Sequence, residues 1–358
     1  MTKPSLKSAL TVTFSHTTRT ESPPTLGGTR ESAVWTGIFD DQFVSTWAPF
    51  GGYVLALALH VTKEEVKRRG LVGKYPEPVS MTTSLMEGGR VDAPYLAIVT
   101  PVRLGGRFAV FDVTFRQESA KKKGVWGTLF NAKVTMADLA GEKGYSAILS
   151  NDGRSKVDYP FAPPALSLVP SDSSSSPSSR LTGLGLPPRN TCVLRTDFDS
   201  ANFLRSPRTG HNFVEVIETL DEPHDPLSLP DIEKGTEWRK WVRWKDNGDV
   251  QDTVALAFWA DLWHSPVGWG MRKGKDDGQA QGPTLEFQIQ IRAIPDPTLE
   301  WILIASRSLF ATNGAKREWD VEIWDERGVL LSVARQLSVS SPRTQRKIDS
   351  QGKNKSTI

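Results

Sequence analysis

The feature that most constrains the fold is an internal repeat. Residues 111–118 read Phe-Asp-Val-Thr-Phe-Arg-Gln-Glu, and about two hundred positions later residues 319–326 read Trp-Asp-Val-Glu-Ile-Trp-Asp-Glu. Both segments continue through a Gly-Val pair into a second β-rich stretch. A repeat of this kind predicts one structural unit that occurs twice. The chain has 358 residues, which is enough for two domains or for one large core made of two fused units.

The two copies differ at one informative position. When they are aligned on Gly124 and Gly328, the second copy has Gln336 where the first has Ala132. A polar amide therefore replaces a residue that suits an apolar environment. This asymmetry suggests that the second copy carries chemistry and that the first mainly supports it.

Each copy has the pattern of one helix followed by an antiparallel meander. In the first copy a helix is expected at residues 53–69, and Gly105-Gly106 predicts a tight hairpin between two of the strands that follow. The pattern is α+β, because helices do not alternate with strands as a parallel sheet requires. The strands expected are residues 34–44, 79–86, 95–104, 108–117 and 125–135, then 213–220, 238–244, 284–291, 301–309, 319–324 and 329–339, with a second helix at residues 252–263.

Changes in composition divide the chain into five segments. Residues 1–29 are expected to form a flexible N-terminus, and residues 30–140 the first repeat. Residues 141–205 are rich in Pro and Ser and predict a flexible connector. Residues 206–340 are expected to form the second repeat, which would carry the catalytic residues, and residues 341–358 a disordered basic tail.

The charge and the cysteine content argue against several partners. The formal net charge is +3, but the last eighteen residues hold five basic side chains against one acidic, so the body is close to neutral and no nucleic-acid partner is expected. The single cysteine, Cys192, excludes a disulfide framework and fits a cytoplasmic protein. The longest apolar run is too short to cross a bilayer, so no membrane span is expected.

Several common catalytic motifs are missing. The sequence contains neither a Gly-x-Ser-x-Gly nucleophile turn nor a phosphate-binding Gly-rich loop. Its five histidines are not spaced as metal ligands, so neither a metal nor a cofactor is expected.

Four motifs together resemble a known family. Residues 47–56, Trp-Ala-Pro-Phe-Gly-Gly-Tyr-Val-Leu-Ala, resemble the entry to the first helix of acyl-CoA thioesterase-like proteins, the group that includes the bacterial type II acyl-CoA thioesterase. Residues 260–263, 283–287 and 332–336 are similar to the segments that carry that family's Asp, Thr and Gln. The resemblance covers about residues 30 to 340, apart from the connector and a stretch after it. It implies a double hotdog, in which two fused repeats each wrap an antiparallel sheet around a central helix.

The resemblance implies catalytic roles for Asp261, Thr284 and Gln336. Together they would hold and activate the water that attacks a thioester carbonyl. Each residue also has an ordinary interpretation, since Asp261 could face water at a helix end, Thr284 could be a plain strand residue, and Gln336 could point outward. An unpaired buried carboxylate is costly, so a buried Asp261 should have hydrogen-bonding partners.

The residues expected at the substrate come from two segments. Gly51 and Gly52 would permit close approach to a helix start, whose backbone N–H groups are candidate oxyanion donors. Tight helix-on-sheet packing explains these glycines equally well. Phe50 and Trp263 are candidate walls of an apolar acyl-binding site.

The function that follows is an acyl-CoA thioesterase-like hydrolase of fatty acid or polyketide metabolism, which gives a free acid and CoA. Two alternatives stay open at this point: a dehydratase, isomerase or cyclase acting on a polyketide-like intermediate, and a non-catalytic acyl-CoA-binding protein. The expected partner is an acyl-CoA or related thioester. A fused pair already forms the two-fold unit of single hotdogs, so both a monomer and a homo-oligomer are compatible with the sequence.

Overall fold

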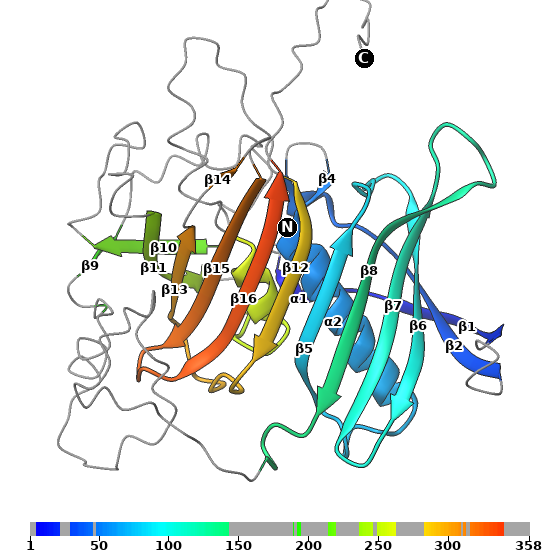
Figure 1. Cartoon of the computed structure of the whole chain (residues 1–358), viewed down its shortest axis with the longest axis horizontal. Coiled ribbons are helices and arrows are strands. Elements are labelled where there is room, and N and C mark those ends of the chain that lie inside the picture. Colours follow the sequence, from blue (N-terminus) through cyan, green and yellow to red (C-terminus); the bar gives the residue numbers. More distant parts are fainter. Residues whose placement is uncertain are drawn as a thin grey trace, which may run out of the picture.

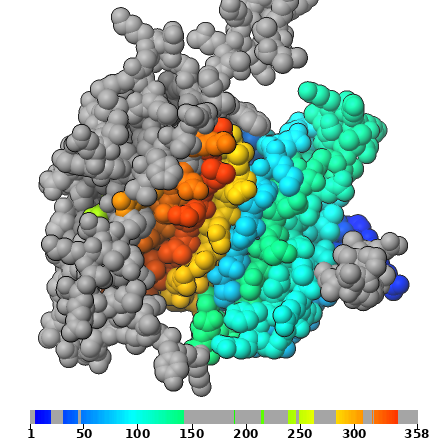
Figure 2. All heavy atoms as spheres, viewed as in Figure 1, coloured from blue at the N-terminus to red at the C-terminus, as the bar shows by residue number. Residues whose placement is uncertain are grey.

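A single large antiparallel sheet organises the molecule and carries both helices of the repeats on one face (Figure 1). The computed structural model describes residues 5–21, 29–45, 48–142, 189, 192–194, 214–219, 236–245, 249–262, 283–308, 311–312 and 316–339. Within these residues the sheet has 14 strands. In Figure 1 the helices lie behind the sheet, and Figure 2 shows its opposite face as a continuous surface of neighbouring strands.

The first repeat contributes one half of the sheet and the long helix α2. Its strands follow the order β1-β2-β6-β7-β8-β5. Alternate residues of these strands are buried, as in β7, because one face packs on the helix and the other does not. The elements are β1 (Thr13–Glu21), β2 (Thr29–Ile38), α2 (Gly51–Arg68), β5 (Glu77–Leu85), β6 (Pro94–Leu104), β7 (Phe108–Glu118) and β8 (Trp126–Ala137).

The second repeat continues the sheet in the order β12-β16-β15-β13-β11-β10-β9, with β14 paired to β15. Its helix α5 is short and completely buried. The elements are β9 (Cys192–Leu194), β10 (Val214–Thr219), β11 (Thr236–Trp244), α5 (Ala255–Ala260), β12 (Thr284–Ile291), β13 (Ile302–Ser308), β14 (Ala311–Thr312), β15 (Lys316–Asp325) and β16 (Leu330–Val339).

The two repeats meet where β5 pairs with β12. At this junction Thr83 lies opposite Phe287. Thr83 in turn pairs with Ala132 of β8, and Phe287 pairs with Gln336 of β16. Ala132 and Gln336 therefore occupy equivalent places on the two sides of the junction, as the alignment of the repeats predicts. The predicted α+β double hotdog is confirmed.

The two helices pack directly against each other. The ring of Phe50, which precedes α2, meets the ring of Phe258 of α5 edge to face at 5.5 Å between centroids. A Cβ atom on Gly52 would lie 2.5 Å from the carbonyl oxygen of Phe258, so this approach requires glycine. The contact brings the start of α2 to the end of α5.

The expectation of a flexible N-terminus at residues 1–29 is wrong for much of that segment. Residues Leu6–Ala9 form helix α1, and β1 pairs with β2. The carboxylate of Asp249 accepts the backbone N–H groups of Leu6 at 2.6 Å and of Lys7 at 3.0 Å. This cap comes from a residue more than 240 positions away, so local sequence could not reveal it.

Two further expectations differ in detail. The strand expected at residues 34–44 ends at Ile38, because Asp40 caps a short 3-10 turn at Asp41–Phe43, which is followed by β3 (Val44–Ser45) and β4 (Ala48–Pro49). The helix expected at residues 252–263 is α5, which ends at Ala260. The basic tail at residues 341–358 and almost all of the connector lie outside the described residues, so the limits of the five segments stay predictions.

Candidate active site

The end of helix α5 places a carboxylate in the interior. Asp261 is the residue that follows the last turn, and only 7% of its surface is exposed. The helix is apolar throughout, from Ala255 to Ala260, so it is drawn into the core and takes the carboxylate with it. Asp261 therefore does not face water, and the solvent-exposed interpretation of this residue is wrong.

Three side chains from three elements converge at this point. Thr284 is the first residue of β12, and its hydroxyl lies 3.4 Å from Oδ1 of Asp261 and 3.3 Å from Oε1 of Gln336. Gln336 is completely buried on β16, and its Nε2 donates to the carbonyl oxygen of Ala260 at 2.8 Å. That bond fixes the amide and turns its oxygen toward Thr284. We refer to Asp261, Thr284 and Gln336 as the trio.

Burial changes the acidity of the carboxylate. Desolvation raises the pKa of Asp261 to about 7, against the smaller opposing effects of hydrogen bonds from the Gly52 backbone N–H and from the Thr284 and Gln336 side chains. Near neutral pH the group is therefore divided between its neutral and ionised forms. A carboxyl group poised in this range can accept a proton and release it again.

The first repeat completes the site. The N–H of Gly52, at the start of α2, donates to Asp261. A Cβ atom on Gly51 would lie 2.2 Å from Oδ2 of the same carboxylate. The site thus lies between the repeats: residues 206–340 supply Asp261, Thr284 and Gln336, and the start of α2 in the first repeat contacts the same carboxylate. The helix start at Gly51-Gly52 serves the carboxylate directly, which the sequence did not indicate.

Of the two residues predicted to form the wall of the acyl-binding site, the structure describes Phe50 but not Trp263. Phe50 is buried against Phe258 beside the trio. Trp263 lies outside the described residues, as does His264. Sequence reasoning missed the carbonyl of Ala260, which orients Gln336, because a backbone acceptor leaves no mark in the residue type.

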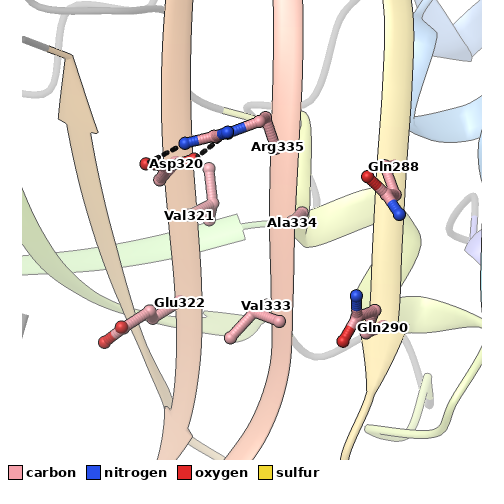
Figure 3. Close-up of a pocket in the computed structure, with 8 residues that line it drawn as sticks. All are labelled: Gln288, Gln290, Asp320, Val321, Glu322, Val333, Ala334 and Arg335. Atoms are coloured by element: carbon pink, nitrogen blue, oxygen red, sulfur yellow. Dashed lines mark hydrogen bonds and ion pairs between the residues drawn. The ribbon is translucent and has the colours of Figure 1, made fainter. Parts of the chain in front are cut away.

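A shallow groove on the opposite face of the sheet is a weaker candidate. Figure 3 shows its residues on β12, β15 and β16. The guanidinium group of Arg335 and the carboxylate of Asp320 face each other (Figure 3). Arg335 donates to Asp320 at 2.7 and 3.2 Å, and Glu322 accepts the indole N–H of Trp324 at 3.0 Å. Arg335 and Asp320 thus compensate each other's charge and Glu322 has a hydrogen-bond donor, whereas the trio concentrates a carboxyl group of shifted pKa among hydrogen-bond donors.

Comparison with protein families decides where the chain belongs. One family model, the acyl-CoA thioesterase N-terminal domain, matches residues 41–137, and another, the acyl-CoA thioesterase C-terminal domain, matches residues 193–340. Together they cover well over half of the chain. The chain belongs to the acyl-CoA thioesterase family. Thr284, Gln336 and Asp261 all lie in the part that matches the C-terminal domain, while Gly51 and Gly52 lie in the part that matches the N-terminal domain.

Solved structures share the fold of this acyl-CoA thioesterase family member. A protein from Thermobifida fusca YX named as a candidate thioesterase II is 17% identical, with a TM-score of 0.61, over 97% of this chain and 100% of that chain. An acyl-CoA thioesterase II from Mycobacterium marinum is 15% identical, with a TM-score of 0.55, over 95% and 99%. A hot dog fold protein of unknown function from Alicyclobacillus acidocaldarius is 15% identical, with a TM-score of 0.60, over 94% and 97%. A comparison with curated proteins found no match.

Two features are absent from the described residues of this family member. Among the described residues, no three His, Cys, Asp or Glu side chains are grouped as metal ligands. In the same part of the chain no helix combines the length and the hydropathy needed to cross a membrane.

The raised pKa of Asp261 gives a prediction about stability. Its pKa is about 7 in the folded protein and close to 3.8 when unfolded, so ionisation costs stability as the pH rises from about 4 to 7. Asp261→Asn removes that cost and is expected to raise the free energy of unfolding at pH 8 by about 1 to 4 kcal/mol. Urea unfolding at pH 8 and at pH 4.5 measures the difference. A variant that is less stable than the parent at pH 8 would contradict the raised pKa of the buried carboxyl group.

Proposed function

We propose that this protein hydrolyses acyl-CoA thioesters to a free acid and CoA at the trio. The observation that carries the proposal is the buried carboxyl group of Asp261, whose pKa is raised to about 7 beside a hydroxyl and an anchored amide. Membership of the acyl-CoA thioesterase family supports a thioester substrate.

Asp261 would act as the general base. In its ionised form it accepts a proton from a water molecule, whose oxygen then attacks the thioester carbonyl carbon. The bond from carbon to the new oxygen forms, the carbon–sulfur bond breaks, and the proton leaves with the CoA thiol. A carboxyl group with a pKa near 7 is suited to both proton transfers. At neutral pH it can take the proton from water and later give it to the CoA thiolate, because neither its neutral nor its ionised form is strongly favoured.

Thr284 and Gln336 would position that water. The Thr284 hydroxyl has one proton and two acceptors at 3.4 and 3.3 Å, both at the long end of hydrogen bonding. A water molecule among the three side chains would give each of them a better partner. The bond from Gln336 to the Ala260 carbonyl holds the amide in place during the attack, which supplies the positioning that lowers the barrier.

Direct attack by water fits the residues nearby better than a covalent nucleophile. The single cysteine, Cys192, is on β9 at the far edge of the sheet, several strands from β12. Thr284 donates toward a carboxylate and an amide oxygen, and among the described residues no histidine accompanies it as a base. The general-base mechanism needs neither a thiol nor a histidine, and it uses Thr284 to position the water rather than as a nucleophile.

The pKa of Asp261 predicts the pH dependence of the reaction. Because the base must be ionised, kcat/KM is expected to rise about tenfold for each pH unit below about 7 and to level off above it. Initial rates of thiol release between pH 5 and pH 9 give the profile. A profile that falls through pH 7 would show that the protonated form is the active one and would contradict the role of base.

Thiol release from acyl-CoA substrates of short, medium and long chain tests the reaction itself. Hydrolysis gives free thiol and a carboxylic acid, which mass spectrometry identifies. A dehydratase would keep the thioester and change the mass of the acyl group by one water, and a cyclase would alter its skeleton. Tight binding of acyl-CoA without thiol release would instead favour a non-catalytic binding protein.

The proposed function also includes a cellular location, a metabolic context and an oligomeric state. We place it in the cytoplasm, in fatty acid or polyketide metabolism, in a protein that acts as a monomer or as a homo-oligomer of double hotdogs. Cell fractionation and sedimentation measurements test these points independently of the chemistry.

A further inference from the structure

Two buried polar groups next to the trio make no hydrogen bond. The Oγ atom of Ser338 and the indole Nε1 atom of Trp319 have no partner within the part of the chain that the structure describes. Ser338 is completely buried, and 3% of the surface of Trp319 is exposed. Removing a polar group from water without a new hydrogen bond is unfavourable, so buried groups of this kind call for a physical explanation.

Their place in the sheet puts both groups beside the catalytic residues. Ser338 lies two residues from Gln336 on β16 and pairs with Thr284 beside a β-bulge in β12, and Trp319 lies directly opposite Gln336 in the pairing of β15 with β16. Directly opposite residues project from the same face of a sheet, with Cβ atoms about 4.5 to 5.5 Å apart. The two unpartnered groups thus flank the trio on the face that carries the helices.

The inference that follows rests on the proposed hydrolase function. We propose that the acyl group of the substrate carries an oxygen substituent, a hydroxyl or a keto group, within the first few carbons from the thioester, and that Ser338 and Trp319 bind this oxygen. An indole N–H can only donate, while a serine hydroxyl both donates and accepts, so the pair suits either substituent.

This arrangement would also disfavour plain alkyl chains. A saturated acyl group in the same place would leave the Ser338 hydroxyl and the Trp319 N–H buried without a partner. Both groups already lack a partner in the protein alone, so a plain chain gains nothing from them, whereas an oxygen-bearing chain gains a hydrogen bond. The two residues would therefore determine specificity rather than carry out the reaction.

Matched substrate pairs test the inference in the full-length protein. Butyryl-CoA is compared with 3-hydroxybutyryl-CoA and 3-oxobutyryl-CoA, and octanoyl-CoA with 3-hydroxyoctanoyl-CoA. The parent is expected to show at least a tenfold higher kcat/KM for the oxygen-bearing member of each pair, roughly the value of one neutral hydrogen bond. Ser338→Ala and Trp319→Phe are each expected to remove about tenfold from that preference, measured as the ratio of kcat/KM within each substrate pair.

The variants are chosen to keep the fold. Trp319→Phe retains an aromatic ring and removes the N–H, and Ser338→Ala removes one oxygen atom. Ser332→Ala is the matched control, because Ser332 is also buried on β16 with an unpartnered hydroxyl but lies six residues, or about 20 Å, from Ser338. It is expected to leave the preference unchanged.

The outcomes separate this inference from the function on which it rests. Thiol release without preference for oxygen-bearing chains, or variants that change both members of a pair equally, would overturn the inference and leave the hydrolase intact. Absence of thiol release from every substrate would overturn both.

Discussion

Asp261→Asn is expected to lower kcat/KM for acyl-CoA hydrolysis about a thousandfold at pH 8. Asparagine keeps the size and much of the polarity of the side chain but cannot accept the proton of the attacking water. General-base catalysis contributes about 10² to 10⁴ in rate, which sets the size of the effect. Thiol release under conditions of low substrate concentration measures kcat/KM directly.

The fold of this variant should be intact, because loss of a buried charge stabilises the protein at pH 8. Asp112→Asn serves as the control: Asp112 forms an exposed ion pair with Lys133 on the first repeat, and its loss is expected to change the rate less than twofold. A variant at Asp261 that retains more than about one tenth of the parental kcat/KM would remove the carboxylate from the mechanism.

Gly51→Ala is expected to lower kcat/KM about a hundredfold or more without changing any polar side chain. The added Cβ atom would lie 2.2 Å from Oδ2 of Asp261, far inside van der Waals contact, so either the carboxylate or the start of α2 must move. A displacement of about 1 Å at a reacting group can cost about a hundredfold in rate. The prediction distinguishes close approach to the carboxylate from general helix packing.

Gly73→Ala provides the comparison, since no heavy atom lies within 4 Å of the Cβ atom that it would add. Its kcat/KM is expected to match that of the parent. The melting temperature of both variants shows how much of the effect at Gly51 comes from instability. Full activity of Gly51→Ala would mean that a Cβ atom fits beside the Asp261 carboxylate without displacing it, and would contradict the geometry of the site.

The strands of both repeats could be predicted because their side chains alternate. β7 and β12 show the reason, since one face of each packs on the helix-bearing side of the sheet and the other does not. Helix α2 could also be predicted from the sequence, because a buried apolar run leads into a charged last turn. The repeat itself followed from the similarity of the segments that form β7 and β15.

The N-terminal segment escaped prediction because its order is imposed from a distance. Helix α1 has four residues, too few to form alone, and the Asp249 carboxylate supplies the partners for its first N–H groups. Strand β1 is rich in Ser and Thr and gains its partner only through β2. Propensity and composition therefore indicated a flexible segment where tertiary contacts decide the structure.

The candidate site was predictable in its residue types but not in its construction. The resemblance to thioesterases pointed to Asp261, Thr284 and Gln336, and the structure brings these three together. The contribution of Gly51 and Gly52 to the same carboxylate depends on how the two repeats pack. The sequence alone does not predict that contact, because the two segments are about two hundred residues apart.

The most direct test of the account is a single-turnover reaction in water labelled with ¹⁸O, with the protein in excess over acyl-CoA at pH 8. We expect a carboxylic acid that carries one ¹⁸O atom in the first turnover, together with one equivalent of free CoA, and a rate that is about a thousandfold lower in Asp261→Asn. Unlabelled acid in the first turnover would show that its oxygen comes from a protein carboxylate, so that an anhydride of the acyl group with Asp261, opened by water at the Asp261 carbon, replaces direct attack by water. Absence of acid and thiol would contradict hydrolysis altogether.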